Sequence, residues 1–251
     1  MLVPEKLIAE VTLVCDSLIN GLVAALGQNL YGIYLYGATV FPDSGPAQDI
    51  DCHVILNAEL TDEELAAVKT LHEHLAEEFP PLGGELDAYY IRLEAARRPE
   101  PPRHQVYPHI TDQAWALHCA HIRAGYYLTL YGPEPEAIFP LPSWTAVSQA
   151  LEHELDFVRA NLRYPAYCIL NLSRILYSFQ TRDVAVSKRA CGRWAAAAYP
   201  EWRSLIEAAL NQYDGRATAT DQMLMETRMN EFLHFIENET TYVRSLNKND
   251  P

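Results

Sequence analysis

The chain has 251 residues, 49% of them hydrophobic, so it can bury a substantial core and has the length of one large or two ordinary domains. Its 19 basic and 33 acidic side chains give a formal charge of −14, which argues against nucleic acid as a partner and favours a cationic small molecule. Five scattered cysteines without a Cys-x-x-Cys spacing argue against a disulfide framework or a zinc knuckle and are expected as packed, reduced thiols.

The first predicted element is a helix over residues 4–26, with apolar residues at helical spacing, Pro4 near its start and Gly27 just past its end. Residues 1–27 carry several acidic side chains rather than the basic start of a signal peptide. No apolar run in the sequence approaches the length of a membrane span. We therefore expect a cytoplasmic protein without a membrane partner.

Two strands are predicted next, over residues 30–36 and 50–56, because aromatic and β-branched residues dominate both segments. The first stops at Gly37, where a tight turn begins. The loop between the strands is rich in Pro, Gly, Ser and Asp, and this composition excludes regular structure. Its exposed backbone N–H groups beside residues 37–39 could meet a phosphate.

A capping-box sequence at residues 61–64 predicts a second helix that ends at residues 80–81, two prolines. A third strand is predicted over residues 85–93, followed by an irregular, proline-rich loop over residues 97–109.

A third helix is predicted over residues 111–123, capped by Thr111 or Asp112. His118 and His121 share a face of it, but no third ligand lies nearby in sequence, so we do not expect a metal site there. A short strand over residues 127–130 completes the elements of this half.

Beyond the prolines and glycine of residues 132–142, every predicted element is a helix. Short breaks separate them, as in an antiparallel bundle. The predicted fold is therefore α+β: a mixed sheet with flanking helices in residues 1–139 and a helical bundle in residues 140–251. The bundle helices cover residues 143–161, 165–180, 187–198, 201–211 and 221–246.

Three carboxylates are candidates for a functional site. Asp49 and Asp51 open the second strand two residues apart, so both project from the same face of the sheet. Their mutual repulsion is relieved when a cation sits between them, and hard oxygen ligands suit Mg²⁺. Asp87 lies inside the third strand and could complete a triad. The alternative interpretation is that Asp49 is a turn residue and Asp51 is a solvated strand residue.

His53 follows on the same face of the sheet, two residues after Asp51. A histidine there is more often a hydrogen-bonded core residue than a ligand of Mg²⁺, so we leave it out of the predicted site.

These residues resemble a known family. A glycine turn, then Asp-x-Asp about a dozen residues later, then an acidic residue on the next strand, is the pattern of the nucleotidyltransferase fold shared with DNA polymerase β. The chain resembles in particular its aminoglycoside 3''/9 adenylyltransferase branch, the streptomycin and spectinomycin resistance enzymes. Residues 130–133 with 139–140, residues 171–178, Lys188 and Trp194 extend the resemblance over most of the chain.

The resemblance implies a Mg²⁺-dependent transfer of AMP from ATP, with release of pyrophosphate, to a hydroxyl of a small acceptor that is aminoglycoside-like. It implies that Asp49 and Asp51 hold the metal and that Asp87 acts as general base or third ligand. Gly37, Ala38 and Thr39 would cradle the phosphates, and Lys188 would contact them from the second domain. Arg174 is a weaker candidate, because an arginine amid apolar residues often pairs with a buried acid.

Two departures from the family open alternatives. The family has Gly-Ser where this chain has Gly37-Ala38, so a hydroxyl for the triphosphate must come from Thr39 or be absent. The family has Glu where this chain has Asp87, which is shorter by about 1 to 1.5 Å, and such a displacement can reduce a rate about a hundredfold. The chain could thus be a nucleotide-binding protein that has lost catalysis, or an adenylyltransferase with a non-aminoglycoside acceptor.

Residues 163–167 bear on the acceptor. Family members that modify streptomycin have acidic side chains near the start of this helix, and this chain has Arg-Tyr-Pro-Ala-Tyr instead. Tyrosines bind a cation less strongly than a carboxylate pair, so we expect weak or absent streptomycin modification.

Overall fold

The computed structural model describes residues 7–43 and 49–247. Contacts divide the chain into two compact units, Met1–Ser143 and Trp144–Pro251, here called the sheet unit and the helical unit. The predicted division at residues 139 and 140 lies close by, and its reading as two domains stays a prediction. Pro4 and part of the predicted loop between the first two strands lie outside the described residues.

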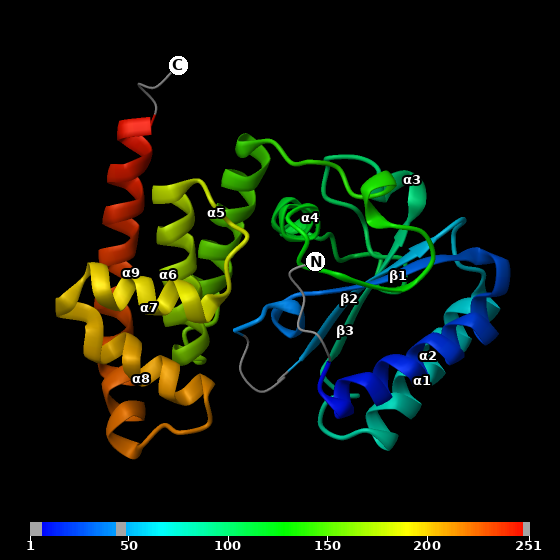
Figure 1. Ribbon diagram of the computed structural model, residues 1–251, viewed down its shortest axis with the longest axis horizontal. Coiled ribbons are helices and arrows are strands. Elements are labelled where there is room, and N and C mark those ends of the chain that lie inside the picture. Colours follow the sequence, from blue (N-terminus) through cyan, green and yellow to red (C-terminus); the bar gives the residue numbers. More distant parts are fainter. Residues whose placement is uncertain (1–6, 44–48, 248–251) are drawn as a thin grey trace. The chain divides into compact units, whose positions relative to one another are not determined.

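The sheet unit is built on four strands in the order β3-β2-β1-β4 (Figure 1). β1 runs antiparallel to β2 and to β4, whereas β2 runs parallel to β3. The sheet is therefore mixed, and the predicted α+β class is confirmed. The strands are β1 (Leu30–Tyr36), β2 (Ile50–Leu56), β3 (Leu86–Arg92) and β4 (Leu128–Tyr131).

Helices cover both faces of this sheet (Figure 1). On one face α1 (Ala9–Leu26) and α2 (Asp62–Glu78) enclose an aliphatic core with the strand residues that alternate toward them. On the other face α3 (Leu93–Ala96) and α4 (Trp115–Arg123) pack on a more aromatic core. The capping box predicted for α2 is confirmed, since Thr61 and Glu64 exchange both capping hydrogen bonds.

α1 corrects one expectation. It is long and apolar enough, by length and composition, to cross a membrane, so the sequence does contain a segment of that length. Its buried residues, which include Val14, Leu18 and Leu22, belong to the core under the sheet. The helix is apolar on this face because it packs on β-strands.

α4 begins later than predicted, and neither predicted cap is used. Its N-cap is Ala114, which makes no side-chain capping bond. Thr111 instead forms an isolated bridge with Arg103, and the Asp112 carboxylate is bonded to two histidines. These tertiary partners engage Thr111 and Asp112, and a turn at residues 113–114 leads into the helix.

The helical unit is organised around α6, whose residues are buried on nearly all sides. The neighbouring helices each pack against it, as in the predicted bundle (Figure 1). The unit comprises α5 (Trp144–Ala160), α6 (Pro165–Thr181), α7 (Lys188–Ala198), α8 (Arg203–Tyr213) and α9 (Ala219–Asn247).

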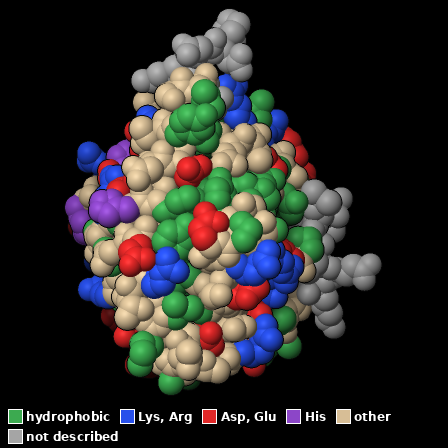
Figure 2. All heavy atoms as spheres, turned by 90° about the vertical axis from the view of Figure 1, so that its left-hand side faces the viewer, with side chains coloured by type: hydrophobic (Ala, Val, Ile, Leu, Met, Phe, Trp, Pro, Cys, Tyr) green, Lys and Arg blue, Asp and Glu red, His purple; other side chains and the backbone are tan. Residues whose placement is uncertain are grey.

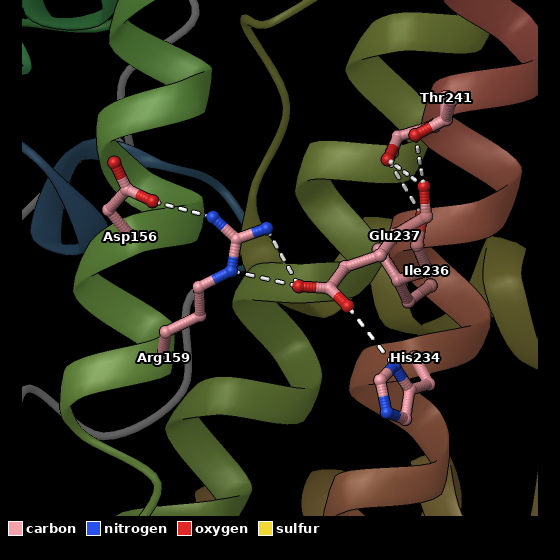
Figure 3. A network of polar contacts seen from close by, with 7 residues as sticks. Asp156, Arg159, His234, Ile236, Glu237 and Thr241 are labelled. Carbon is pink, nitrogen blue, oxygen red and sulfur yellow. Dashed lines mark hydrogen bonds and ion pairs between the residues drawn. The ribbon is translucent and has the colours of Figure 1, made fainter.

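Charges in the helical unit are arranged as opposite pairs. Arg159 on α5 bonds Asp156 at 2.6 Å and Glu237 on α9 at 2.7 Å, and His234 lies 3.3 Å from the second oxygen of Glu237 (Figure 3). Figure 2 shows a face on which Lys and Arg side chains stand beside Asp and Glu rather than in separate fields. Each exposed pair adds little, about 0 to 1 kcal/mol, so apolar packing carries most of the stability of the bundle.

Candidate active site

The three predicted carboxylates meet at the start of two parallel strands. In the β2/β3 ladder Asp51 stands directly opposite Asp87, so their backbones are about 4.8 Å apart and both side chains emerge from the same face. Asp49 precedes β2 by one residue and is exposed. The register thus adds Asp87 to the Asp49–Asp51 pair, which local sequence patterns alone could not establish.

Gly37 closes this cluster from the end of β1. It has φ +74°, and a Cβ atom at this position would lie 1.9 Å from Oδ2 of Asp51. The turn therefore requires glycine for two reasons, the left-handed backbone and the contact with the carboxylate. This contact brings the turn and the acidic strand together at one place.

A short 3₁₀ helix, Ala38–Val40, follows with Gly37 as its N-cap. The first amides of a helix have no acceptor within it, so this turn presents N–H groups next to the acidic cluster. The Thr39 hydroxyl donates to the Tyr36 carbonyl oxygen at 3.2 Å. Its hydrogen is therefore committed to the turn, and Ala38 offers no hydroxyl in its place.

Asp87 has an unusual environment. The residue is exposed as a whole, yet desolvation raises the pKa of its carboxyl; the charge of His118 opposes this shift, and the charges of Asp112 and Asp49 add to it. Asp87 also lines a cavity of about 340 Å³ in the sheet unit. The cavity wall is aromatic and charged, and includes Glu73, Tyr89, His104 and Tyr107.

Tyr36, the last residue of β1, lies close enough to several acidic side chains for their charges to affect it. Burial raises its pKa well above the ordinary value, and the charges of Asp51, Asp112 and Asp87 each raise it further. Its ring stacks on His53, with 4.2 Å between ring centroids. His53 is fully buried there, as expected for a core residue.

Lys188 lies in the helical unit, at the first position of α7 after the capping residue Ser187. Its Nζ atom stands 4.1 Å from the centroid of the Tyr167 ring. Arg189 follows directly, so two cations open a helix whose dipole disfavours positive charge at this end. The first turn of α7 contains no acidic residue, and Arg189 pairs with Asp214 at the end of α8.

Arg174 has a structural role. Its guanidinium bonds Glu154 at 3.1 Å, and both side chains are largely buried. Asn171 donates to the same carboxylate oxygen at 2.9 Å. The predicted pairing of Arg174 with an acidic neighbour is confirmed.

A group that the sequence patterns missed lies behind Tyr36. His53, Asp112 and His118 come from β2, from the loop before α4 and from α4, and they meet in the sheet unit. His118 was considered with His121 on its own helix, whereas the cluster joins it to Asp112, six residues earlier, and to His53 on β2. His53 on β2 could be noted in the sequence, but its meeting with Asp112 and His118 depends on tertiary packing.

Comparison with known proteins agrees with this fold. Residues 140–239 match the family model described as aminoglycoside adenylyltransferase, C-terminal domain. A crystal structure of the spectinomycin adenyltransferase AAD(9) from Enterococcus faecialis with ATP and spectinomycin is similar to this chain, with a TM-score of 0.73 and 16% sequence identity. The similarity covers 92% of this chain and 99% of that one. The curated proteins include no match.

The fold and the matched domain define the chain as an enzyme of the nucleotidyltransferase class. More particularly, residues 140–239 are similar to the C-terminal domain of aminoglycoside adenylyltransferases, in agreement with the sequence resemblance.

Proposed function

We propose that the protein transfers AMP from ATP, with Mg²⁺, to a hydroxyl of a small hydroxylated and cationic acceptor in the cytoplasm. The observation that carries the proposal is the register of Asp51 opposite Asp87, with Gly37 against Asp51. Like charges placed side by side are unfavourable unless a cation or a substrate compensates them. In a nucleotidyltransferase, carboxylates at this position would hold the metal ion that accompanies the nucleotide.

The donor set fits Mg²⁺. Asp49, Asp51 and Asp87 offer hard carboxylate oxygens at the start of two strands, and water and phosphate would supply the remaining ligands. When bound, the metal would neutralise the triphosphate and the leaving pyrophosphate. The carboxylates themselves fix where the phosphates lie relative to the Gly37 turn.

Asp87 is the proposed general base. Its desolvation raises the pKa of the carboxyl, which makes the carboxylate a better acceptor for the proton of an attacking hydroxyl. The cavity that it lines also contains Glu73 and Tyr107, an acid and an aromatic ring. These groups suit a hydroxylated acceptor that carries a positive charge.

The proposed nucleotide contacts come from both ends of the chain. The amides of Ala38 and Thr39 after Gly37 would bind phosphate oxygens, and Lys188 would supply a positive charge from the helical unit. The position of Lys188 supports this role, because the helix dipole disfavours a positive charge at the N-terminal end of α7.

A nucleotide-binding protein that has lost catalysis is the alternative. It is favoured by the Thr39 hydroxyl, whose hydrogen is bonded to Tyr36, and by the short side chain of Asp87. An adenylyltransferase with an acceptor unrelated to aminoglycosides is a third reading, because the residues at the start of α6 lack acids.

Pyrophosphate release separates these readings. The assay compares ATP and Mg²⁺ alone, with spectinomycin, with streptomycin, and with other hydroxylated cations. We expect acceptor-dependent release that is lost in Asp87→Asn, whereas Asp87→Glu retains or increases it because the longer side chain restores the reach of the family residue. Streptomycin should be a poor acceptor. ATP binding without release for any acceptor would favour the impaired protein.

A further inference from the structure

The strongest cluster of ligating side chains outside the acidic site consists of His53, Asp112 and His118. One ligand atom from each residue lies within 4.8 Å of the other two. Nε2 of His53 is 3.4 Å from Oδ2 of Asp112, and Nδ1 of His118 is 2.9 Å from the same oxygen. Two imidazole nitrogens and one carboxylate oxygen therefore converge on a single point.

The charge at this point is unusual for a protein interior. Asp112 is 2% exposed, and within residues 7–43 and 49–247 its ion-pair partners are histidines rather than Lys or Arg. A carboxylate buried to this degree is unfavourable unless hydrogen bonds or a cation compensate its charge.

His53 is fully buried, and its Nε2 atom faces the Asp112 carboxylate. A cation held by all three groups would compensate the charge of that buried carboxylate. Histidine binds a metal through a lone pair of its imidazole ring.

We infer that His53, Asp112 and His118 form a second metal site, distinct from the acidic cluster, that takes Zn²⁺ or a similar borderline divalent cation. Two nitrogens and one oxygen are a common ligand set for such ions, whereas Mg²⁺ prefers oxygen alone. The ion would have a fourth position for water. The inference does not depend on the proposed adenylyl transfer.

The surroundings of His53 limit the affinity of the site for a metal ion. Nδ1 of His53 is buried and has no hydrogen-bond partner among the described residues. Ligand histidines usually donate this second N–H to an acceptor, and loss of such a partner typically weakens binding by about 10- to 100-fold. We therefore expect weaker binding than in a fully supported site with the same three ligands.

The position of the site gives it a structural consequence. A bound ion would join β2 to α4 and to the loop before α4. Tyr36 packs on both histidines, with centroid distances of 4.2 Å to His53 and 4.5 Å to His118. Tyr36 directly precedes Gly37, so the ion would fix the wall on which the acidic cluster rests.

Cobalt substitution tests this inference on the whole chain. After chelator treatment, Co²⁺ is titrated in the presence of excess Mg²⁺, which occupies oxygen sites. We expect one equivalent with the visible band of four-coordinate Co²⁺, which Asp112→Asn and His118→Gln each abolish. Asp51→Asn in the acidic cluster and His74→Ala at an exposed histidine of α2 should both retain the band.

Absence of the band in the wild type, or full retention in both Asp112→Asn and His118→Gln, would overturn the site. If far-UV circular dichroism shows that either variant does not fold, the presence or absence of the band in the wild type decides the test. Zn²⁺ at a 100-fold excess over its dissociation constant should raise the unfolding midpoint by about 5 °C, and Mg²⁺ should not. Equal midpoints with both metals would show that the cluster is a hydrogen-bonded group only.

Discussion

Charges are arranged differently in the acidic cluster of the sheet unit and in the helical unit. In the sheet unit Asp51 stands opposite Asp87, with Asp49 nearby, and neither Asp49 nor Asp87 has an ion-pair partner among the described residues. In the helical unit charges occur as pairs, such as Arg174 with Glu154 and Arg189 with Asp214. The first arrangement is unfavourable by itself, whereas the second contributes to packing.

This difference distinguishes candidate functional sites from parts of the chain that only maintain the fold. Opposite pairs need no explanation beyond the fold, but carboxylates gathered by strand register need a ligand that compensates them. Lys188, at the start of α7, is the residue of the helical unit that we propose to contact the nucleotide. The following predictions test this contrast in order of expected effect.

Gly37→Ala should have the largest effect. The new Cβ would overlap the Asp51 carboxylate, and φ is strained for alanine, so we expect a loss of about 3 kcal/mol or more in the free energy of unfolding and loss of ATP binding. Gly125→Ala is the matched control, because its φ is +91° but no atom lies within 4 Å of its Cβ. It should lose about 1 kcal/mol and bind ATP normally. Equal losses in chemical denaturation would contradict the contact with Asp51.

The sheet unit should also be the acid-sensitive one. Nδ1 of buried His104 accepts hydrogen bonds from the Val106 and Tyr107 amides, and burial lowers its pKa to about 4. Because the folded pKa lies below the unfolded value of about 6.5, its contribution is complete above pH 6.5 and is lost as the pH falls through 4. The loss amounts to at most about 3 kcal/mol.

His104→Asn keeps an acceptor near Nδ1 without a titrating group, so its unfolding free energy should fall less between pH 7 and pH 4. His74→Asn, at an exposed position, should follow the wild type. Parallel curves for the wild type and His104→Asn would assign the acid sensitivity to other groups.

Lys188→Ala tests the proposed nucleotide contact of the helical unit. We expect ATP binding to weaken by about 1.5 to 3 kcal/mol if the lysine is desolvated at a phosphate. Arg216→Ala, which removes an exposed cation of the same unit, should leave the affinity unchanged. An unchanged dissociation constant in Lys188→Ala would limit this lysine to its contact with Tyr167.

Breaking a pair in the helical unit should affect stability and leave ATP affinity unaltered. Arg174→Met leaves Glu154 partly buried and uncompensated, at a cost of about 1 to 2 kcal/mol, and the added change Glu154→Gln should restore part of it. Asp156→Asn in an exposed pair should change stability by less than about 0.5 kcal/mol. Equal effects at both pairs would show that burial does not matter here.

Local sequence patterns predicted those elements that local chemistry determines. β1 and β2 have the predicted bounds, because aromatic and β-branched runs end at turn residues, and α2 starts where its capping box lies. The start of α4 was wrong because Asp112 is engaged by His53 and His118, which no local pattern indicates. Tertiary contacts override capping preference at such a position.

The candidate site, too, could be predicted from local sequence patterns only in part. The i, i+2 spacing of Asp49 and Asp51 could be read directly, whereas the place of Asp87 opposite Asp51 depends on a parallel pairing across the intervening α2. The cluster around Asp112 draws on three separate segments, so the single histidine pair on α4 gave no indication of it. Strand pairing and packing, which sequence periodicity does not encode, decided both cases.

Calorimetric titration of ATP, with and without Mg²⁺, tests most directly whether the gathered carboxylates form a metal–nucleotide site. The wild type should bind ATP tightly only with Mg²⁺, and Asp49→Asn or Asp51→Asn should lose this dependence and most of the affinity, because the metal would be under-coordinated beside a polyphosphate. Equal ATP affinity with and without Mg²⁺ in the wild type, or unchanged binding in Asp51→Asn, would contradict the proposed site.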